Sequence, residues 1–369
     1  MESIEQMIKR LCPKGVEYVK LGEVCEIRRG IRVVKKQLGE EDGYPVFQNS
    51  LTSLGMYQSS NRKAGTTFII CAGAAGEIGY CNSEFWAADD CSTVESDVLI
   101  DRFIYFYLMT QQYKLKSQVR KASVPRLSRE AIENLIIPLP PLEIQSRIVE
   151  VLDKMTTLTA ELEAELEARK QQYEYYRNKL LSFSEIGGGI RFVKLGDVCE
   201  LERGKVFSKK YIEEHPGQYP VFSSQTANNG ELGKIDTFNY NGEFLTWTTD
   251  GAYAGTIFYR EGKFSITNVC GLIKNNDTMF NIKFLFHWLR LVAKNYVYSG
   301  MGNPKLMSNQ TAEILIPVLT MQEQQRIVSI LDRFEALTTD LQSGLPAEIE
   351  ARRQQYEYYR NKLLTFDAV

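Results

Sequence analysis

Two long stretches of the chain place apolar residues every three or four positions. The first stretch carries Ile148, Leu152, Met155, Leu158, Leu162, Leu166, Tyr173, Tyr176, Leu180 and Phe183. The second carries Ile327, Leu331, Phe334, Leu337, Leu341, Leu345, Ile349, Tyr356, Tyr359, Leu363 and Phe366. Such steps put the apolar side chains on one narrow stripe, which is typical of a helix that packs against another helix. The pattern predicts two long helices that pair with each other.

Both stretches end in almost the same sequence. EARKQQYEYYRNKLL runs from Glu167 to Leu181, and EARRQQYEYYRNKLL runs from Glu350 to Leu364, so that fifteen residues differ only by a Lys-to-Arg exchange. Chance does not reproduce a stretch this well, so the chain contains a duplicated element. The second stretch is four residues longer between its matching ends, and the extra part includes Gly344 and Pro346. These two residues should interrupt or kink the second helix.

The segments in front of the long helices repeat as well. VKLGEVCEIRRG at 19–30 matches VKLGDVCELERG at 193–204, and YPVF occurs at 44–47 and again at 219–222. Between these matches the sequences diverge, but both show short β-rich runs separated by Gly, Asn and Asp turns, followed by a helix at 102–111 or 282–294. One unit is therefore written twice, with a common frame and different interiors, and each interior is predicted to be α+β.

The repeats divide the chain into six parts. These are an amphipathic N-terminal helix and lead-in (1–18), a first mixed α/β domain (19–141), a central helix (142–183), a glycine-rich linker (184–192), a second mixed domain (193–321) and a C-terminal helix (322–369).

Composition narrows the class of protein. The 369 residues are 44% hydrophobic and 24% charged, as in ordinary folded proteins, and the formal net charge of −2 argues mildly against a chain that grips nucleic acid alone. Seven cysteines form no C-x-x-C pair and only His215 and His287 accompany them, so we expect no metal site. No run is apolar enough to span a membrane, and MESIEQ does not read as a signal peptide. We expect a cytoplasmic protein.

The repeated frame resembles the specificity subunit of type I restriction–modification systems. The resemblance is carried by KLGEVCEIRRG, YPVF, IPLPPLEIQSRIVEVLD and QQYEYYRNKLL together with their second copies, and it covers essentially the whole chain. It implies two target recognition domains joined by two long antiparallel coiled-coil helices, with an internal pseudo-two-fold repeat. Each domain would read one half of a bipartite site in double-stranded DNA.

The resemblance also implies partners. The helices would hold two methyltransferase subunits and, through them, the restriction subunits. S-adenosylmethionine, ATP and Mg²⁺ would then belong to those partner subunits, and this chain would hold no cofactor.

Cations recur at corresponding turns of the two units. They are Arg28, Arg29, Arg32, Lys35 and Lys36 in the first unit and Arg203, Lys205, Lys209 and Lys210 in the second. Such repeated cations are what contacts to DNA phosphates need. The alternative is a solvated surface loop, because runs of surface charge are common.

Polar loops follow the two YPVF segments. Their candidate base-reading residues are Gln48, Asn49 and Ser50 in the first unit and Ser223, Ser224, Gln225, Asn228 and Asn229 in the second. Asn and Gln pair bidentately with adenine edges, so loops that differ between the units suit different target sequences. The alternative is that Ser, Asn and Gly simply form turns.

A third candidate is the loop ahead of each long helix. It carries Arg120, Lys121, Ser123 and Arg126 in the first unit and Asn303 and Lys305 in the second. A rigid proline turn with small residues and one cation allows the backbone to approach DNA closely, whereas the alternative is a loop fixed by packing. On the long helices, the pairs Tyr175–Arg177 and Tyr358–Arg360 suit a protein partner, since both tyrosines point off the apolar stripe.

Catalytic motifs are missing from the sequence. It has no Asn-Pro-Pro-aromatic or Asp-Pro-Pro-aromatic tetrapeptide for an adenine methyltransferase and no GxxxxGK[ST] loop for ATP, and two distant histidines cannot form an HNH centre. The sequence therefore predicts a non-catalytic DNA-recognition subunit. The alternative is a protein-interaction scaffold whose coiled coil joins two modules for ligands other than DNA.

Overall fold

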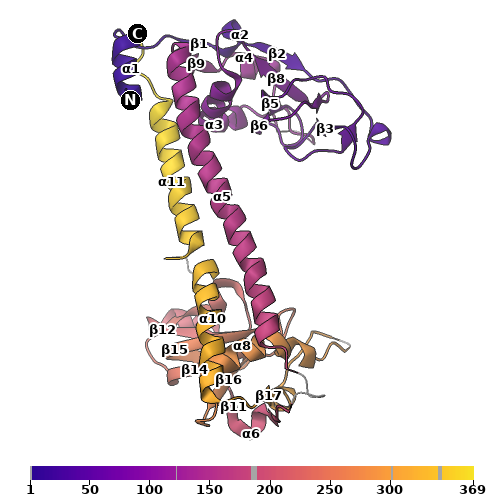
Figure 1. The fold of residues 1–369 in the computed structure, drawn as a ribbon, viewed down its shortest axis with the longest axis vertical. Helices are drawn as coiled ribbons and strands as arrows, with labels where there is room; N and C mark the ends of the chain where they lie inside the picture. The colour runs from indigo at the N-terminus through magenta and orange to yellow at the C-terminus, as the bar shows by residue number, and fades with distance from the viewer. Residues whose placement is uncertain (1, 122, 184–188, 301, 340–342) are drawn as a thin grey trace. The chain divides into compact units, whose positions relative to one another are not determined.

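The computed structural model describes residues 1–369 except 1, 122, 184–188, 301 and 340–342, so most of the predicted glycine-rich linker lies outside the described residues. The chain forms two compact units, which we describe separately (Figure 1). Unit 1 comprises Met1–Glu163 and Glu348–Val369, and unit 2 comprises Ala164–Ala347. No helix within the described ranges is both long and apolar enough to cross a membrane.

Unit 1 is a mixed α/β domain. Its elements before the long helix are α1 (Ile4–Leu11), β1 (Tyr18–Lys20), α2 (Leu21–Val24), β2 (Glu26–Arg29), η1 (Lys35–Gln37), β3 (Tyr44–Phe47), β4 (Met56–Tyr57), β5 (Thr66–Ile70), β6 (Ile78–Cys81), β7 (Trp86–Ala87), β8 (Cys91–Glu95), α3 (Asp101–Ser117), α4 (Arg129–Glu133) and β9 (Ile136–Pro138). They form a four-stranded sheet ordered β2-β8-β5-β6, a three-stranded sheet ordered β4-β3-β7, and the pair β1-β9. α3 extends beyond the predicted 102–111, because Leu115 is also buried in the core.

Unit 2 repeats this arrangement of elements. They are β10 (Phe192–Lys194), α6 (Leu195–Val198), β11 (Cys199–Arg203), α7 (Lys209–Glu214), β12 (Pro216–Phe222), η2 (Ala227–Gly230), β13 (Glu231–Ile235), β14 (Tyr240–Thr248), β15 (Ile257–Ile266), β16 (Cys270–Asn275), α8 (Ile282–Val292), η3 (Ala293–Tyr296), α9 (Ser308–Ala312) and β17 (Leu315–Pro317).

Strand β15 makes the sheets of the two units differ. It pairs antiparallel with β14 along one part and parallel with β12 along another, so a single six-stranded sheet forms in the order β11-β16-β14-β15-β12-β13. In unit 1 the corresponding run is split into β6 and β7 by Asn82, Ser83 and Glu84, which favour turns over strands. β7 nevertheless keeps the parallel pairing with β3.

The long helices are α5 (Leu142–Leu180), α10 (Met321–Thr339) and α11 (Leu345–Leu363). The predicted interruption of the second stretch is confirmed, because α10 ends at Thr339 and a new helix starts at Leu345. Pro346 lies in the first turn of α11, where its missing N–H removes no helical hydrogen bond.

Within each unit the long helices pack at their domain ends. In unit 1, Tyr356 and Phe366 join a core that contains Ile148 and Leu152, and Figure 1 shows α11 beside the first part of α5. In unit 2, Tyr173 is buried and Tyr176 stacks on Phe334 with ring centroids 5.6 Å apart.

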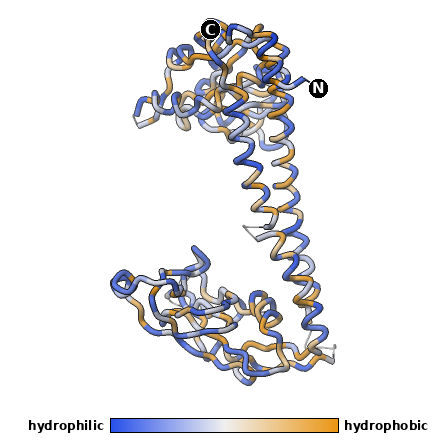
Figure 2. Tube along the Cα trace, turned by 90° about the vertical axis from the view of Figure 1, so that its left-hand side faces the viewer, coloured by the Kyte–Doolittle hydropathy of each residue, from blue (hydrophilic) through white to orange (hydrophobic). Residues whose placement is uncertain are grey.

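Away from the domain ends the apolar stripe opens to solvent. Leu158 is 50% exposed, Leu337 is 37% exposed and Tyr359 is 38% exposed, so these positions of the stripe are only partly covered. Figure 2 shows hydrophilic and hydrophobic positions mixed along the helices.

The two termini of unit 1 lie together. The Tyr18 hydroxyl donates to the carbonyl of Phe366 at 3.1 Å, and Lys362 lies 3.2 Å from Glu5 of α1. Val16 forms a parallel bridge with Ala368. The last residues of the chain therefore complete the first domain.

Candidate nucleic-acid interface

The proline loop of unit 1 is held by its backbone. The Leu127 amide donates to the Cys71 carbonyl at 2.8 Å, and the Gly73 amide donates to the Pro125 carbonyl at 3.2 Å. Arg126 itself exchanges backbone hydrogen bonds with Arg120 at 2.8 and 3.2 Å. Its side chain is exposed and forms no hydrogen bond or ion pair with another described residue. The backbone around Arg126 is therefore held by hydrogen bonds, while its guanidinium group is exposed and unpaired among the described residues.

Unit 2 reproduces this arrangement. The Leu306 amide donates to the Thr249 carbonyl at 3.0 Å, and the Gly251 amide donates to the Pro304 carbonyl at 3.1 Å. Lys305 exchanges backbone bonds with Tyr298 at 2.8 and 3.0 Å, and its exposed ammonium has no partner among the described residues. Two interiors that differ in sequence therefore hold one cation in the same way.

Other candidates of unit 1 gather beside the proline loop. The Arg29 Nε donates to the Asp89 carbonyl at 2.8 Å, and the Gln48 amide donates to the Asp89 carboxylate at 3.3 Å. The Asn49 carbonyl accepts from the Ala74 amide at 2.9 Å, and so ties the polar loop to the glycine-rich turn. Ser50 instead bonds within its own loop, to the Thr52 carbonyl.

A pocket of about 320 Å³ lies where these segments meet. It is lined by Ile27, Arg29, Cys71, Asp89, Asp90, Ser92, Arg126, Leu127 and Arg129. Three of these residues are arginines and two are aspartates. The pocket thus offers both donors and acceptors for groups on a polar ligand.

In unit 2 the corresponding candidates also converge. The Arg203 Nη2 donates to the Asn268 carbonyl at 2.9 Å, which matches Arg29 and Asp89 in unit 1. The Ser223 hydroxyl accepts from Thr267 at 3.2 Å, and Gln225 donates to the Glu231 carbonyl. Of the remaining loop residues, Ser224 is half-buried, and Asn228, Asn229 and Asn303 are exposed.

The predicted cations differ in their freedom. Arg28 is held by Glu26 at 2.6 Å and Glu95 at 3.2 Å, and its hydrogen bond to Glu26 raises its pKa. Lys210 lies 3.6 Å from Glu214 on α7. Exposed cations whose side chains form no hydrogen bond or ion pair with another described residue are Arg32, Lys35, Lys36, Arg120, Lys121, Lys205 and Lys209, and Ser123 is also exposed. The side chains of this second set are not paired with a carboxylate of the described residues, so they are open to an external anion.

Two further cations, the half-buried Arg62 and the buried Arg260, were not predicted from the sequence. Arg62 donates to Thr93 Oγ1 at 2.8 Å and to the Arg29 carbonyl at 3.0 Å. Arg260 is only 3% exposed, and its Nη2 donates to the Asn229 carbonyl at 2.8 Å. An arginine inside the β-rich run TIFYREGKF was the available signal for Arg260.

The candidate partner-binding residues lie on the long helices. Tyr175 is 58% exposed and Tyr358 is 62% exposed. Arg177 and Arg360 are half-buried, with their guanidinium carbons 5.7 and 5.4 Å from the ring centroids of Tyr173 and Tyr356. The two exposed tyrosines are thus available to a partner, while each arginine also packs on its own helix.

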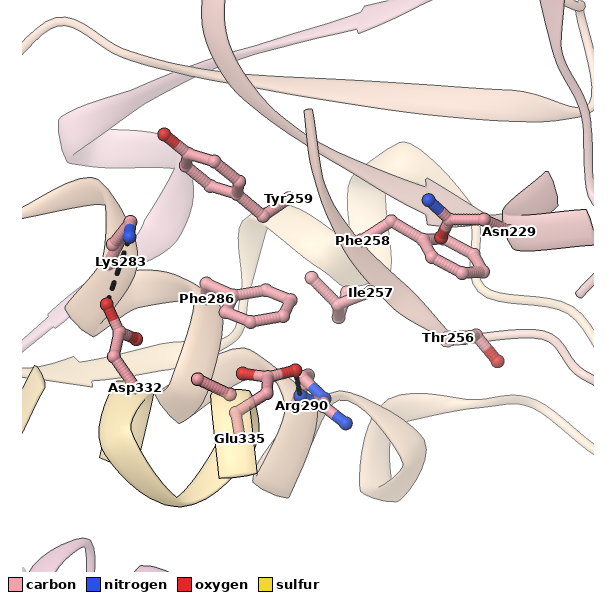
Figure 3. Close-up of a pocket in the computed structure, with 11 residues that line it drawn as sticks. Asn229, Thr256, Ile257, Phe258, Tyr259, Lys283, Phe286, Arg290, Asp332 and Glu335 are labelled. Carbon is pink, nitrogen blue, oxygen red and sulfur yellow. Dashed lines mark hydrogen bonds and ion pairs between the residues drawn. The ribbon is translucent and has the colours of Figure 1, made fainter. Parts of the chain in front are cut away.

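A cluster of one histidine and two carboxylates lies at a different pocket of unit 2. This pocket has a volume of about 620 Å³ and is lined by residues of β15, α8 and α10 (Figure 3). Lys283 lies 3.0 Å from Asp332, and Arg290 lies 2.8 Å from Glu335. His287 Nε2 lies 2.8 Å from Asp332. Burial favours a raised pKa for Asp332, but hydrogen bonds from His287 and Lys283 outweigh it and lower the pKa.

This cluster does not need a metal ion. The ligand atoms of His287, Asp332 and Glu335 lie within 4.8 Å of one another, but each carboxylate already faces a cation. The Lys283–Asp332 pair has an equivalent in unit 1, where Arg102 lies 2.7 Å from Asp153. In both units the pair joins the domain helix to a long helix, which makes it a structural contact.

The two units thus share a domain frame, and each holds an exposed cation, Arg126 or Lys305, by the same backbone hydrogen bonds. The model of the type I restriction modification DNA specificity domain matches residues 13–169 and 188–351. The chain belongs to this family. It is a DNA specificity subunit of a type I restriction–modification system, the non-catalytic component that recognises DNA sequence. The scaffold alternative finds no support in these matches.

Relatives and solved structures agree with this assignment. A putative type I specificity subunit of Mycoplasma pneumoniae is 39% identical over 249 residues, which are 66% of this chain and 91% of that protein. A putative type I restriction enzyme specificity subunit of Haemophilus influenzae is 29% identical over 381 aligned positions, which cover 95% of this chain and 96% of that protein. The crystal structure of an S subunit from M. genitalium superposes with a TM-score of 0.71 at 17% identity over 96% of this chain and 97% of that one, which shows a common fold.

Proposed function

We propose that the first domain, 19–141, reads one half of a bipartite DNA site and that the second, 193–321, reads the other half. The observation that carries this proposal is the repeated proline loop, which presents Arg126 in one unit and Lys305 in the other with the same backbone hydrogen bonds. The polar loops beside these cations differ in sequence, as two readers of different half-sites require.

The candidate residues divide into two roles. Phosphates are contacted by Arg28, Arg29, Arg32, Lys35, Lys36, Arg120, Lys121, Arg203, Lys205, Lys209 and Lys210, which position the protein on the duplex. Base edges are contacted from Gln48, Asn49, Ser50, Ser123, Arg126, Ser223, Ser224, Gln225, Asn228, Asn303 and Lys305. Asn229, whose carbonyl accepts a hydrogen bond from Arg260, supports the loop that carries Asn228. Arg28 and Lys210 must exchange an intramolecular carboxylate for a phosphate, so they contribute less than the free cations.

The long helices have a second task. In this proposal they form an antiparallel coiled coil with pseudo-two-fold symmetry, set the gap between the half-sites, and bind two methyltransferase subunits through Tyr175, Arg177, Tyr358 and Arg360. Exposed aromatic side chains beside arginine are typical of protein interfaces. Restriction subunits join through the methyltransferase, and S-adenosylmethionine, ATP and Mg²⁺ bind to the partner subunits.

Coexpression with the cognate methyltransferase subunits tests the proposal. Methylome sequencing of such cells should find adenine methylation at one split sequence, and cells without this chain should lose it. The purified chain alone should show no methyl transfer, cleavage or ATP hydrolysis. Methyl transfer by the chain alone, or methylation of the same sequence without it, would contradict the proposal.

A further inference from the structure

Arg260 on β15 is a buried cation with an unusual environment. Its guanidinium carbon lies 3.6 Å from the ring centroid of Phe222 and 4.5 Å from that of Phe258, and its Nε donates to Thr246 Oγ1 at 3.2 Å. No carboxylate among the described residues forms an ion pair with it. Burial lowers its pKa to about 10, so the group is still charged at neutral pH. A buried charge is costly, and its retention calls for a specific role.

The remaining contact of Arg260 indicates that role. Its Nη2 donates to the carbonyl of Asn229 at 2.8 Å. Asn228 and Asn229 have φ values of 49° and 51°, and among the described residues they are the non-glycine residues with positive φ. This left-handed conformation is disfavoured for side chains other than Gly, Asn and Asp. Arg260 therefore holds a turn that has a tendency to relax.

We call the hydrogen bond from Arg260 to the Asn229 carbonyl the clamp. Unit 1 has no clamp at the equivalent position. In the strand pairing of unit 1, Cys81 lies opposite Thr66 of β5, and in unit 2 Arg260 lies opposite Phe244 of β14. Cys81 and Arg260 therefore occupy equivalent positions in the two sheets. Cys81 belongs to an apolar cluster with Phe68 and Phe85. The clamp is therefore not part of the frame that the two units share, and is a feature of unit 2.

The two asparagines of the turn differ in their surroundings. Asn229 lines the pocket of Figure 3 at the same end as Phe258, and its carbonyl is the acceptor for Arg260. Asn228 is exposed, lines none of the pockets described above, and its carboxamide has no hydrogen bond to another described residue. A carboxamide offers a donor and an acceptor side by side, which match the N6 and N7 groups of adenine.

We propose that Asn228 reads the edge of an adenine in the half-site of unit 2, and that Arg260 is a positioning residue that fixes the Asn228–Asn229 turn for this contact. The inference rests on the proposed function of unit 2 as a DNA reader. A turn that is already ordered before binding avoids the entropic cost of ordering on DNA, so the contact discriminates more strongly.

The substitution Asn228→Gly tests the reader, with Asn229→Gly as the matched control. Both glycines tolerate positive φ and keep the backbone carbonyls, so neither should lower the midpoint of unfolding. The assembled complex with methyltransferase subunits is assayed on duplexes in which each base pair of either half-site is replaced in turn. Asn228→Gly should lose about ten-fold or more of the preference at one adenine of the second half-site. Asn229→Gly should keep that preference, and both should leave the first half-site unchanged.

The substitution Arg260→Met tests the positioning role. Methionine retains apolar contact with the two rings but cannot hold the Asn229 carbonyl. We expect the same position of the half-site to lose its preference, and no further loss when Arg260→Met is combined with Asn228→Gly. A purely structural role would lower the rate on all sequences alike and leave the ratio between bases unchanged. That result would overturn the role of Arg260.

The outcomes separate this inference from the proposed function. Full preference at every position of the second half-site in Asn228→Gly overturns the inference, as does its loss in Asn229→Gly alone. A wild-type complex without any preference at the second half-site overturns the proposed function itself. Should Arg260→Met fail to fold, the two asparagine variants still decide whether Asn228 reads a base.

Discussion

Replacing Arg126 by Ala removes the guanidinium and leaves its supporting hydrogen bonds in place. The bonds to Arg120 are made by the backbone, and the side chain is exposed and forms no bond to another described residue. The free energy of unfolding should therefore change by no more than about 0.5 kcal/mol. Lys305→Ala is the matched substitution in unit 2, since Lys305 has the same backbone hydrogen bonds.

The effect on DNA depends on what Arg126 contacts. Loss of a base contact costs about 1–3 kcal/mol, which corresponds to about 5- to 150-fold in affinity. Loss of a phosphate contact weakens binding to all sequences and reduces the slope of log affinity against log salt by about one. Loss of a base contact should reduce preference only at the half-site that the first domain reads, and loss of a base contact in Lys305→Ala should reduce preference only at the other half-site.

Fluorescence anisotropy of the complex with methyltransferase subunits measures both quantities. The duplexes carry the intact site or a change in one half-site, over salt concentrations of about 50–200 mM. Lys9→Ala, which removes one exposed charge from α1, is the control and should leave affinity unchanged. Arg126→Ala with wild-type affinity and wild-type salt slope would refute the reasoning, because the proline loop would then be a packing element only. An equal effect of Arg126→Ala and Lys305→Ala on one half-site would refute the assignment of one reader to each unit.

Three further predictions concern the frame and the helices. Exchange of residues 19–137 for the corresponding segment of another specificity subunit should change one half-site in the methylome, and a change in both halves would disprove independent domains. Duplication of Thr159–Leu162 in α5 adds about 6 Å of helix and rotates the apolar stripe by only about 40°. The gap between half-sites should therefore grow by one or two base pairs. A folded, active variant that keeps the original gap would show that the helices do not set the gap. Gly30→Ala places a Cβ 2.0 Å from the Ala88 carbonyl oxygen and should cost at least about 1–3 kcal/mol in denaturant unfolding, whereas Gly39→Ala, 3.8 Å from its nearest neighbour, should change little.

The amino-acid sequence by itself determined the repeat and the type of its elements. Apolar residues at steps of three and four predict long helices without knowledge of the tertiary structure, because the helical period relates residues that are close in sequence. Pro346 divides the second helix for an equally local reason, since it cannot donate a hydrogen bond in a helix interior. The repeated sequence at 19–30 and 193–204 likewise predicts one domain frame built twice.

Tertiary structure decided which of the candidate residues are free to act. The sequence offers Arg28 and Arg126 alike as candidate DNA-binding cations. Folding brings Glu95 to 3.2 Å from Arg28 but brings no carboxylate of the described residues into an ion pair with Arg126. The same holds for the clamp between Arg260 and Asn229, which are 31 positions apart, and for Tyr18 and Phe366, which are 348 positions apart. Contacts of this kind depend on how sheets and loops pack in three dimensions, and no local pattern of residues encodes them.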